Sequence, residues 1–195
     1  MNVVVILPCL NDHESLDAIL PDIHYDGWKT HVTTLLGLPN AIHQSILGTD
    51  ADVVVVMDSD GQQPPVYIKR LVTALQEHDA DLVTASRTNW AHTLQGTISR
   101  TGNWLVCKYL HLGVRDCTSG FYAAKRSRLL ELPDSVWAGY GDYFIQLLWE
   151  ARQRKWGVAE ISFHSCRRIT GESHTRPLKH TIMYAGRALH LRRQQ

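Results

Sequence analysis

The chain contains 195 residues, enough for one domain with a small appendage. Its 20 Lys and Arg residues nearly balance its 19 Asp and Glu residues, which argues against a protein that binds nucleic acid through overall positive charge. A hydrophobic fraction of 44% with 20% charged residues argues against a disordered chain, and no run reaches the roughly 20 apolar residues needed to span a bilayer.

The first half of the chain alternates apolar runs with helical spacing. Residues 3–7 form a β-branched run ended by Pro8, which is typical of a strand buried on both faces and not of a signal peptide. Residues 52–57 include four consecutive valines and give the clearest strand. In chain order we expect a strand over 3–7, a helix over 14–20 that ends at Pro21, a candidate strand over 31–35, a helix over 40–47 and a strand over 52–57.

The second half continues this alternation. Pro64 and Pro65 suit the first turn of a helix, because proline is tolerated there. The expected elements are, in order, a helix from these prolines to residue 77, a strand over 81–85, a helix over 97–111, a turn leading into a strand over 118–123, a helix over 143–155, a strand over 158–163 and a helix over 178–191. Strands that alternate with helices predict an α/β sandwich with a largely parallel sheet.

Acidic and amide side chains directly follow the valine-rich strand. Asp58 and Asp60 lie two residues apart and so point the same way on an extended chain, with Gln62 beyond them. Ligands of open α/β sheets bind beyond the carboxyl ends of the strands. Oxygen ligands of this kind suit Mg²⁺ or Mn²⁺ shared with substrate phosphates. The pattern therefore predicts a metal–diphosphate site, with a solvated acidic turn as the alternative.

Motifs of several other chemistries are missing from the sequence. It contains no Walker-type phosphate loop, no complete G-x-G-x-x-G and no G-x-S-x-G nucleophile elbow. Asp58 and Asp60 are too close together to flank a glycosidic bond as a hydrolase pair. The four cysteines make no C-x-x-C pair, which favours reduced thiols over a zinc or redox site.

Six segments carry a resemblance to a known family. They are residues 7–12 (LPCLND), 56–65 (VMDSDGQQPP), 85–87 (ASR), 99–103 (SRTGN), 116–121 (DCTSGF) and 168–173 (RITGES). Together they resemble the family 2 glycosyltransferases of the dolichol-phosphate mannose synthase type. The resemblance is strong over residues 40–175 and weaker over 3–14. It implies a GT-A fold, a three-layer Rossmann-like α/β sandwich around a mostly parallel central sheet.

The resemblance also implies roles for individual residues. Donor and nucleotide binding falls to Pro8, Leu10, Asp12 and Asp58, and the implied metal ligands are Asp58, Asp60 and Gln62. Catalytic positions are matched by Asp60, Arg87 and Arg168, and the acceptor side by Ser99, Asp116 and Ser119. The charges agree with these roles, because a cation and arginines stabilise a diphosphate that gains negative charge as it leaves.

The implied reaction is inverting transfer of a hexose, mannose or glucose, to a polyprenyl or dolichyl phosphate. The donor would be a nucleotide sugar of the GDP-mannose or UDP-glucose class, and the cofactor Mg²⁺ or Mn²⁺. A lipid phosphate is already an anionic nucleophile, so no general base is required and guanidinium groups suffice to position it. Two alternatives stay open: a non-lipid acceptor such as a protein or glycan, and a degenerate relative that binds without catalysis.

The sequence departs from the family pattern in its first half. It lacks the acidic D-D-x-S segment that grips the nucleoside, and the stretch between Asp12 and Met57 is too short for the usual elements. We therefore expect one early β/α unit to be missing. Gln95, Gln146 and His174 stand where the family often carries arginine, glutamate and lysine, so the site region has lost charge.

The C-terminal segment is basic, with no acidic residue after Glu172. We expect residues 1–175 to form the glycosyltransferase domain and residues 176–195 a basic amphipathic helix. Its apolar face would comprise Leu178, Ile182, Ala185 and Leu189. Such a helix either lies on an anionic membrane surface or packs on the domain with its basic face in solvent. We expect a cytoplasmic protein, in the first case peripheral on the cytoplasmic face of a membrane.

Overall fold

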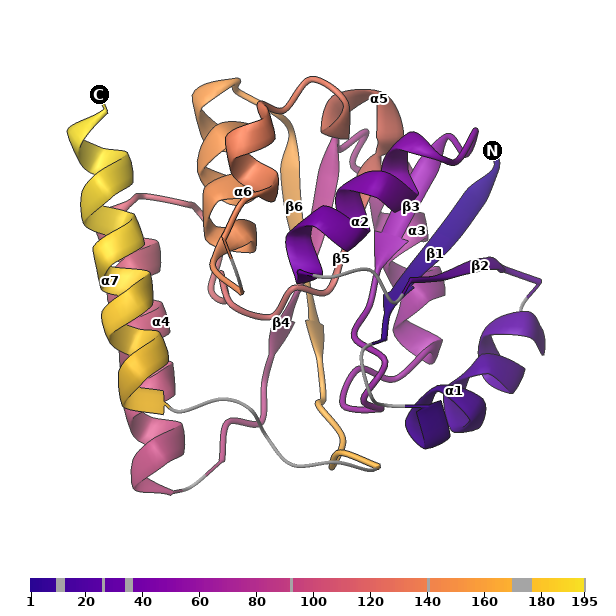
Figure 1. Cartoon of the computed structure of the whole chain (residues 1–195), viewed down its shortest axis with the longest axis horizontal. Coiled ribbons are helices and arrows are strands. Elements are labelled where there is room, and N and C mark those ends of the chain that lie inside the picture. Colours follow the sequence, from indigo (N-terminus) through magenta and orange to yellow (C-terminus); the bar gives the residue numbers. More distant parts are fainter. Residues whose placement is uncertain are drawn as a thin grey trace.

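The structure, a computed structural model, describes residues 1–9, 13–25, 27–33, 37–91, 93–139, 141–169 and 177–194. Within these ranges, helices cover both faces of a six-stranded sheet and confirm the expected three-layer α/β sandwich (Figure 1). The strands lie in the order β2-β1-β3-β5-β4-β6. They are β1 (Val3–Pro8), β2 (Lys29–Thr33), β3 (Val53–Val56), β4 (Leu82–Arg87), β5 (Tyr122–Lys125) and β6 (Val158–Phe163).

The sheet is mostly parallel. β5 lies between β3 and β4 and pairs antiparallel with both, for instance Val54 with Ala124 and Val83 with Ala123. β1 pairs parallel with β2 and β3, and β4 pairs parallel with β6. The carboxyl ends of these parallel strands therefore meet at one edge of the sheet, where an open α/β sheet binds its ligands.

The helices connect these strands. They are α1 (His13–Tyr25), α2 (Leu38–Leu47), α3 (Val66–Glu77), α4 (Leu94–Tyr109), α5 (Arg126–Leu129), α6 (Tyr143–Gln153) and α7 (Pro177–Arg193), with the short 3₁₀ helix η1 (Asp134–Trp137). Among the described residues, two strand–helix units, β1–α1 and β2–α2, precede β3. None of the described helices is long and apolar enough to cross a membrane.

Two helix boundaries differ from the sequence expectation by three residues or more. α1 continues past Pro21, where we expected it to end. Ile19 and Ile23, on either side of the proline, are both buried, so packing holds the helix together across the missing backbone hydrogen bond. α4 begins three residues earlier than expected because the Thr93 hydroxyl accepts a hydrogen bond from the Gly96 N–H at 3.0 Å and caps the helix.

The core has two parts, one on each face of the sheet. Val54 and Val56 pack in the part that contains α2 and α6, whereas Val53 and Val55 pack in the part that contains α1 and α3. The four-valine strand is therefore buried on both faces, as its continuous apolar sequence predicted. This burial fixes the position of the residues that follow β3.

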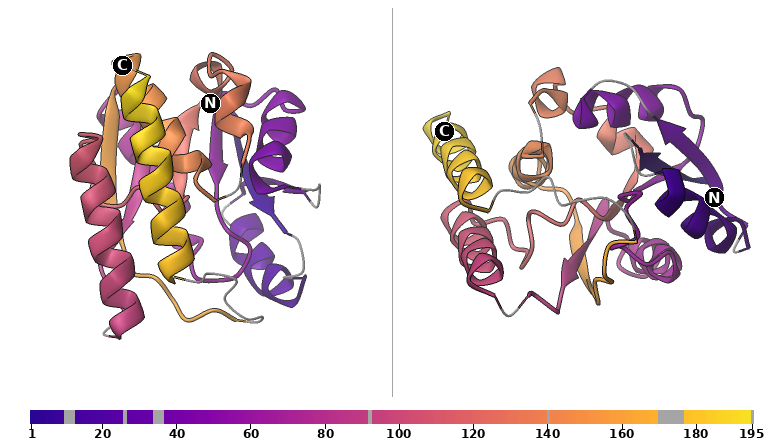
Figure 2. Two further views of the ribbon diagram at one scale, coloured as in Figure 1. Left: turned by 60° about the vertical axis from the view of Figure 1, so that its left-hand side comes forward. Right: turned by 60° about the horizontal axis from the view of Figure 1, so that its bottom comes forward.

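The C-terminal helix packs on the domain. α7 and α4 lie side by side at one end of the molecule (Figure 2). Two members of the expected apolar face, Ile182 and Leu189, point outward and are 65% and 49% exposed. A second stripe at helical spacing, with Tyr184, Ala188 and Leu191, packs against the core.

Candidate active site

The loop after β3 carries the first group of site residues and is held by one glutamine. The Gln63 Oε1 accepts a hydrogen bond from the Asp58 backbone N–H at 2.8 Å. The Gln63 Nε2 donates to the Asp58 Oδ2 and to the Ser119 carbonyl, both at 2.9 Å. Gln63 thereby joins the Asp58 loop to the segment that precedes β5, which the sequence analysis also assigned to the site.

Gly61 makes the tight turn of this loop possible. Its φ is +80°, in the left-handed region where glycine meets no steric penalty. A Cβ at this position would lie 2.5 Å from the side chain of Ile169. The glycine therefore allows Asp60 and the segment around Ile169 to approach each other closely.

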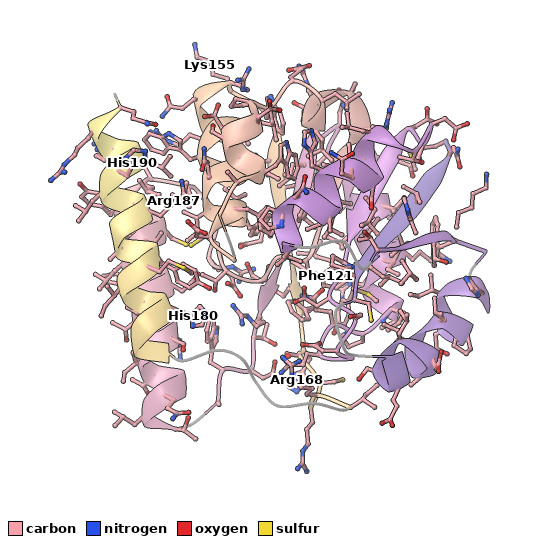
Figure 3. The ribbon with its side chains drawn as sticks, in the orientation of Figure 1. Phe121, Lys155, Arg168, His180, Arg187 and His190 are labelled. Carbon is pink, nitrogen blue, oxygen red and sulfur yellow. The ribbon has the colours of Figure 1, made fainter. Side chains whose placement is uncertain are left out.

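Arg168, labelled in Figure 3, pairs with Asp60 of the β3 loop. Backbone hydrogen bonds from Cys166 N–H to the Gln62 carbonyl, at 2.9 Å, and from Ile169 N–H to the Asp60 carbonyl, at 3.1 Å, set the register of the two segments. The Arg168 guanidinium then forms an ion pair with the Asp60 Oδ2 at 2.8 Å and donates to the Gln62 Oε1 at 3.3 Å. One cationic group thus bridges the oxygens of two predicted metal ligands.

These oxygens form a suitable environment for a hard cation. Asp60 is only 6% exposed, and its Oδ1 accepts the Gln62 N–H at 2.8 Å while its Oδ2 faces Arg168. The described residues hold no cluster of three or more His, Cys, Asp and Glu side chains that could bind a metal alone. Asp58, Asp60 and Gln62 could hold Mg²⁺ or Mn²⁺ if phosphate and water supply the remaining ligands, which is usual for Mg²⁺.

Arg87 and Asp116 form a second ion pair near the carboxyl end of β4. The Arg87 Nε and Nη2 bind the two carboxylate oxygens of Asp116 at 2.7 and 2.9 Å, a bidentate arrangement. The Arg87 Nη2 also donates to the Thr118 Oγ1 at 2.7 Å. The Trp90 ring lies 4.2 Å from the guanidinium carbon. Arg87 is therefore held on several sides while 28% of its side chain stays exposed.

Asp116 is buried and charged in this pair. Burial opposes its negative charge, but the Arg87 charge and hydrogen bonds from Arg87 and from the Thr118 N–H outweigh burial and hold the pKa of Asp116 below its usual value. Both carboxylate oxygens are engaged in these contacts. Asp116 thus fixes the position of Arg87.

A pocket of about 140 Å³ opens beside Asp58. Its lining comprises Leu38, Asp58, Thr118, Ser119, Gly120, Gly141, Tyr143, Phe144, His180 and Tyr184. The last two belong to α7, and Figure 3 shows His180 on the side of α7 turned toward the rest of the domain. Burial raises the pKa of Tyr184 to about 12, so its hydroxyl remains a hydrogen-bond donor at neutral pH.

The structure brings some of the predicted site residues together and leaves others apart. Asp58, Asp60, Gln62 and Arg168 converge on the β3 loop, where the Pro8 carbonyl also accepts a hydrogen bond from Ser59 at 2.8 Å. Ser119 borders the pocket, whereas its described lining does not include Ser99, which lies on α4. Leu10, Asp12 and the 171–174 segment lie outside the described residues.

Two residues to which the sequence analysis gave no role in the site, Asn103 and Glu160, support it. Asn103 accepts the Cys117 N–H at 2.9 Å and donates to the Arg115 carbonyl at 2.7 Å. Glu160 accepts the Arg115 N–H at 2.7 Å and its Nε–H at 2.6 Å. These contacts join residues far apart in the chain and fix the segment that leads to Asp116, so only a three-dimensional structure reveals them.

Comparisons with known proteins identify the family of this chain. The family model described as glycosyl transferase family 2 matches residues 6–123, more than half of the chain. The chain belongs to this family and is a glycosyltransferase, which favours the enzyme over the non-catalytic alternative.

The curated relatives are glycosyltransferases too. An uncharacterized glycosyltransferase of Mycobacterium tuberculosis is 29% identical over 88% of this chain and 88% of the relative. The polyprenol monophosphomannose synthase of Mycolicibacterium smegmatis is 26% identical over 87% of this chain and 79% of that protein. The match extends across most of each protein.

Solved structures confirm the GT-A fold. One is the glucosyl-3-phosphoglycerate synthase of Mycobacterium tuberculosis in complex with Mn²⁺, UDP-glucose and phosphoglyceric acid. It superposes with a TM-score of 0.72 at 21% sequence identity, and the match covers 97% of this chain and 78% of that chain. The same enzyme with Mg²⁺ and UDP gives a TM-score of 0.68 at 20% identity, over 97% and 77%.

Proposed function

We propose that this glycosyltransferase transfers a hexose, mannose or glucose, from a nucleotide diphosphate sugar to a polyprenyl phosphate, with inversion at the anomeric carbon. The single observation that carries the proposal is the convergence of Asp60, Gln62 and Arg168 in one ion-paired cluster at the carboxyl end of β3. Such a cluster can balance the charge of a diphosphate on one side and of a phosphate nucleophile on the other.

The donor side of the reaction would use the β3 loop. Asp58, Asp60 and Gln62 would hold Mg²⁺ or Mn²⁺, which would neutralise the departing diphosphate when bound. The relatives with solved structures bind Mn²⁺ or Mg²⁺ together with UDP, which supports the same use of these residues here. Arg168 pairs with the Asp60 Oδ2 at 2.8 Å. If a cation took the place of the arginine at that oxygen, the Arg168 guanidinium could bind a phosphate of the substrate instead.

The acceptor side would use the arginines and the pocket. A phosphate oxygen of the acceptor attacks the anomeric carbon, the bond from that carbon to the diphosphate oxygen breaks, and its electron pair stays on the diphosphate. The attacking oxygen is already anionic, so the chain needs no residue to remove a proton from it. Arg87, whose Nε and Nη2 are held by Asp116, would offer its Nη1 to this phosphate, and Arg168 would offer its guanidinium.

The choice of a lipid phosphate rests on the polyprenol monophosphomannose synthase among the relatives. The solved neighbours act with a different phosphate-bearing acceptor, since their complexes contain phosphoglyceric acid. The shared chemistry is therefore an acceptor that carries a phosphate. The experiment must therefore distinguish a lipid phosphate acceptor from a non-lipid acceptor.

A product assay tests the proposal. The full chain would be incubated with GDP-mannose or UDP-glucose, with Mn²⁺ or with EDTA, and with short-chain polyprenyl phosphate in detergent, 3-phosphoglycerate or no acceptor. We expect a glycosyl polyprenyl phosphate of inverted anomeric configuration, formed only with Mn²⁺. A product formed on 3-phosphoglycerate in place of the lipid would overturn the lipid acceptor. Transfer that persists in EDTA would overturn the metal requirement.

A further inference from the structure

The outer face of the α4–α7 pair is apolar. We define it by Trp104, Leu105, Tyr109, Ile182, Ala185 and Leu189. The two large α4 residues Trp104 and Leu105 are 55% and 54% exposed, comparable with Ile182 on α7 at 65%. A groove of about 270 Å³ runs between the helices, and the described residues that line it are Tyr109 and five aliphatic residues. Large exposed apolar side chains gathered on one pair of helices around such a groove indicate an interaction site.

The charged side chains of α4 and α7 are all basic. Neither α4 nor α7 contains an acidic residue. α4 carries Arg100 and Lys108, which are exposed, and α7 ends in Arg192 and Arg193. Arg187 of α7 does not add to the charge of the outer face. It turns inward and pairs with Asp142 at 2.5 Å, so its charge is balanced within the domain.

The opposite face of α7 borders the candidate active site. His180 and Tyr184 line the pocket beside Asp58, while Ile182 and Leu189 of the same helix point outward. A helix with its side chains is roughly 10 Å across, so the pocket lies about one helix diameter behind the outer face. Whatever the outer face binds is therefore held next to the site.

We propose that the outer face of α4 and α7 docks on an anionic lipid membrane. The apolar side chains would enter the interface, Trp104 and Tyr109 would sit at the headgroup level, and the basic residues would meet anionic headgroups. A second copy of the chain fits less well, because face-to-face pairing would bring two rows of cations together. The purpose of docking, delivery of a lipid-bound phosphate, rests on the proposed function, whereas the binding itself does not.

Vesicle co-sedimentation of the full chain tests the proposal without any substrate. The face variant is Leu105→Glu/Ile182→Glu, at two exposed positions where a charge should leave the fold intact. The matched control is Leu47→Glu/Val66→Glu, which adds the same charge at side chains that are 49% and 65% exposed on α2 and α3. Circular dichroism and thermal unfolding would show that both variants fold.

We expect the unmodified chain and the control to sediment with vesicles of phosphatidylcholine and phosphatidylglycerol, and less with phosphatidylcholine alone or at high salt. The face variant should bind at least tenfold more weakly than the control. Equal binding of the two variants would overturn the proposal. The proposal would also be overturned if the unmodified chain bound no vesicles but formed a dimer that the face variant did not form.

The product assay separates this inference from the proposed function. Transfer to short-chain polyprenyl phosphate in detergent without vesicle binding would refute docking and leave the reaction standing. Vesicle binding without transfer to any polyprenyl phosphate would refute the reaction and leave docking standing.

Discussion

The Arg168 guanidinium lies 2.8 Å from the Asp60 Oδ2 and also donates to the Gln62 Oε1. The arginine therefore occupies the oxygens that the sequence analysis assigned to a divalent cation. It is brought there by backbone hydrogen bonds between the 166–169 segment and the β3 loop. A cation and Arg168 would compete for Asp60, so metal loading and the position of this arginine are coupled.

This coupling predicts an unusual effect of Arg168→Met. Removing a positive charge next to Asp60 should tighten the binding of Mn²⁺ alone by about tenfold, because ~1.4 kcal/mol of repulsion disappears. The same change should lower the rate of glycosyl transfer, since no guanidinium remains for the phosphates. Mn²⁺ titration followed by electron paramagnetic resonance measures the first effect. Weaker Mn²⁺ binding in this variant would show that Arg168 does not compete with the metal.

The Arg87–Asp116 pair predicts a large stability effect of Arg87→Met. The variant leaves the Asp116 carboxylate, which is 1% exposed, without its counter-charge. Loss of one partner from a buried pair typically costs ~3–5 kcal/mol. Urea unfolding of the variant should show a loss of this size, and Arg87→Met/Asp116→Asn should recover part of it. A loss below about 1 kcal/mol would mean that the pair is effectively solvated.

The lowered pKa of Asp116 predicts acid lability. Its ordinary value is 3.8, and the native value lies lower, so the unfolded chain binds the proton first as the pH falls. The stabilisation from this group is therefore complete above the ordinary value and lost as the pH falls through the native value. The free energy of unfolding should decline below about pH 4 in the unmodified chain. The decline should be shallower in Asp116→Asn. Identical pH dependence of the free energy of unfolding in the two proteins would contradict this role of Asp116.

Tyr184→Phe tests the contribution of α7 to the pocket. The change removes one hydroxyl from a residue that lines the same pocket as Asp58 and Thr118, and it keeps the ring. Loss of one hydrogen bond to a bound substrate corresponds to roughly 0.5–1.5 kcal/mol, or about two- to twelvefold in kcat/KM. The unfolding midpoint should change little. Tyr109→Phe, on the outer face of α4, is the matched control and should leave kcat/KM for short-chain polyprenyl phosphate in detergent, without vesicles, unchanged.

Gly61→Ala should disturb the β3 loop. The left-handed φ of +80° and the predicted contact with Ile169 both oppose a side chain at this position. We expect a destabilisation of about 1–3 kcal/mol in urea unfolding. Adding Ile169→Ala should relieve the contact but not the backbone strain, so the double variant should recover only in part. Full recovery would indicate that the backbone conformation carries no strain.

The parts of the fold that the sequence predicted are local. The buried β3 strand and the Asp58–Gln62 loop adjoin in the chain, so continuous valines and the spacing of the carboxylates were enough to place them. The family resemblance identified Arg168, but its pairing with Asp60 depends on a contact between segments more than a hundred residues apart. The bidentate Arg87–Asp116 contact likewise requires the folded chain.

Other features had no readable sequence signal. The short run Tyr122–Lys125 does not reveal that β5 is antiparallel, because strand direction depends on the neighbours. α7 has two apolar stripes at helical spacing, and only packing selects Tyr184, Ala188 and Leu191 as the inner one. Pro21 interrupts the hydrogen bonding of α1, yet the buried Ile23 carries the helix beyond it.

The central claim is that the Asp60 and Gln62 oxygens hold a divalent cation together with the donor diphosphate. The most direct test is calorimetric titration of GDP and UDP, with and without Mn²⁺. The titrated proteins are the unmodified chain, Asp60→Asn and the exposed control Asp22→Asn. We expect Mn²⁺-dependent binding of at least one nucleotide that survives in Asp22→Asn and is lost in Asp60→Asn while the fold is retained. Equal Mn²⁺-dependent affinity in all three proteins would contradict the claim.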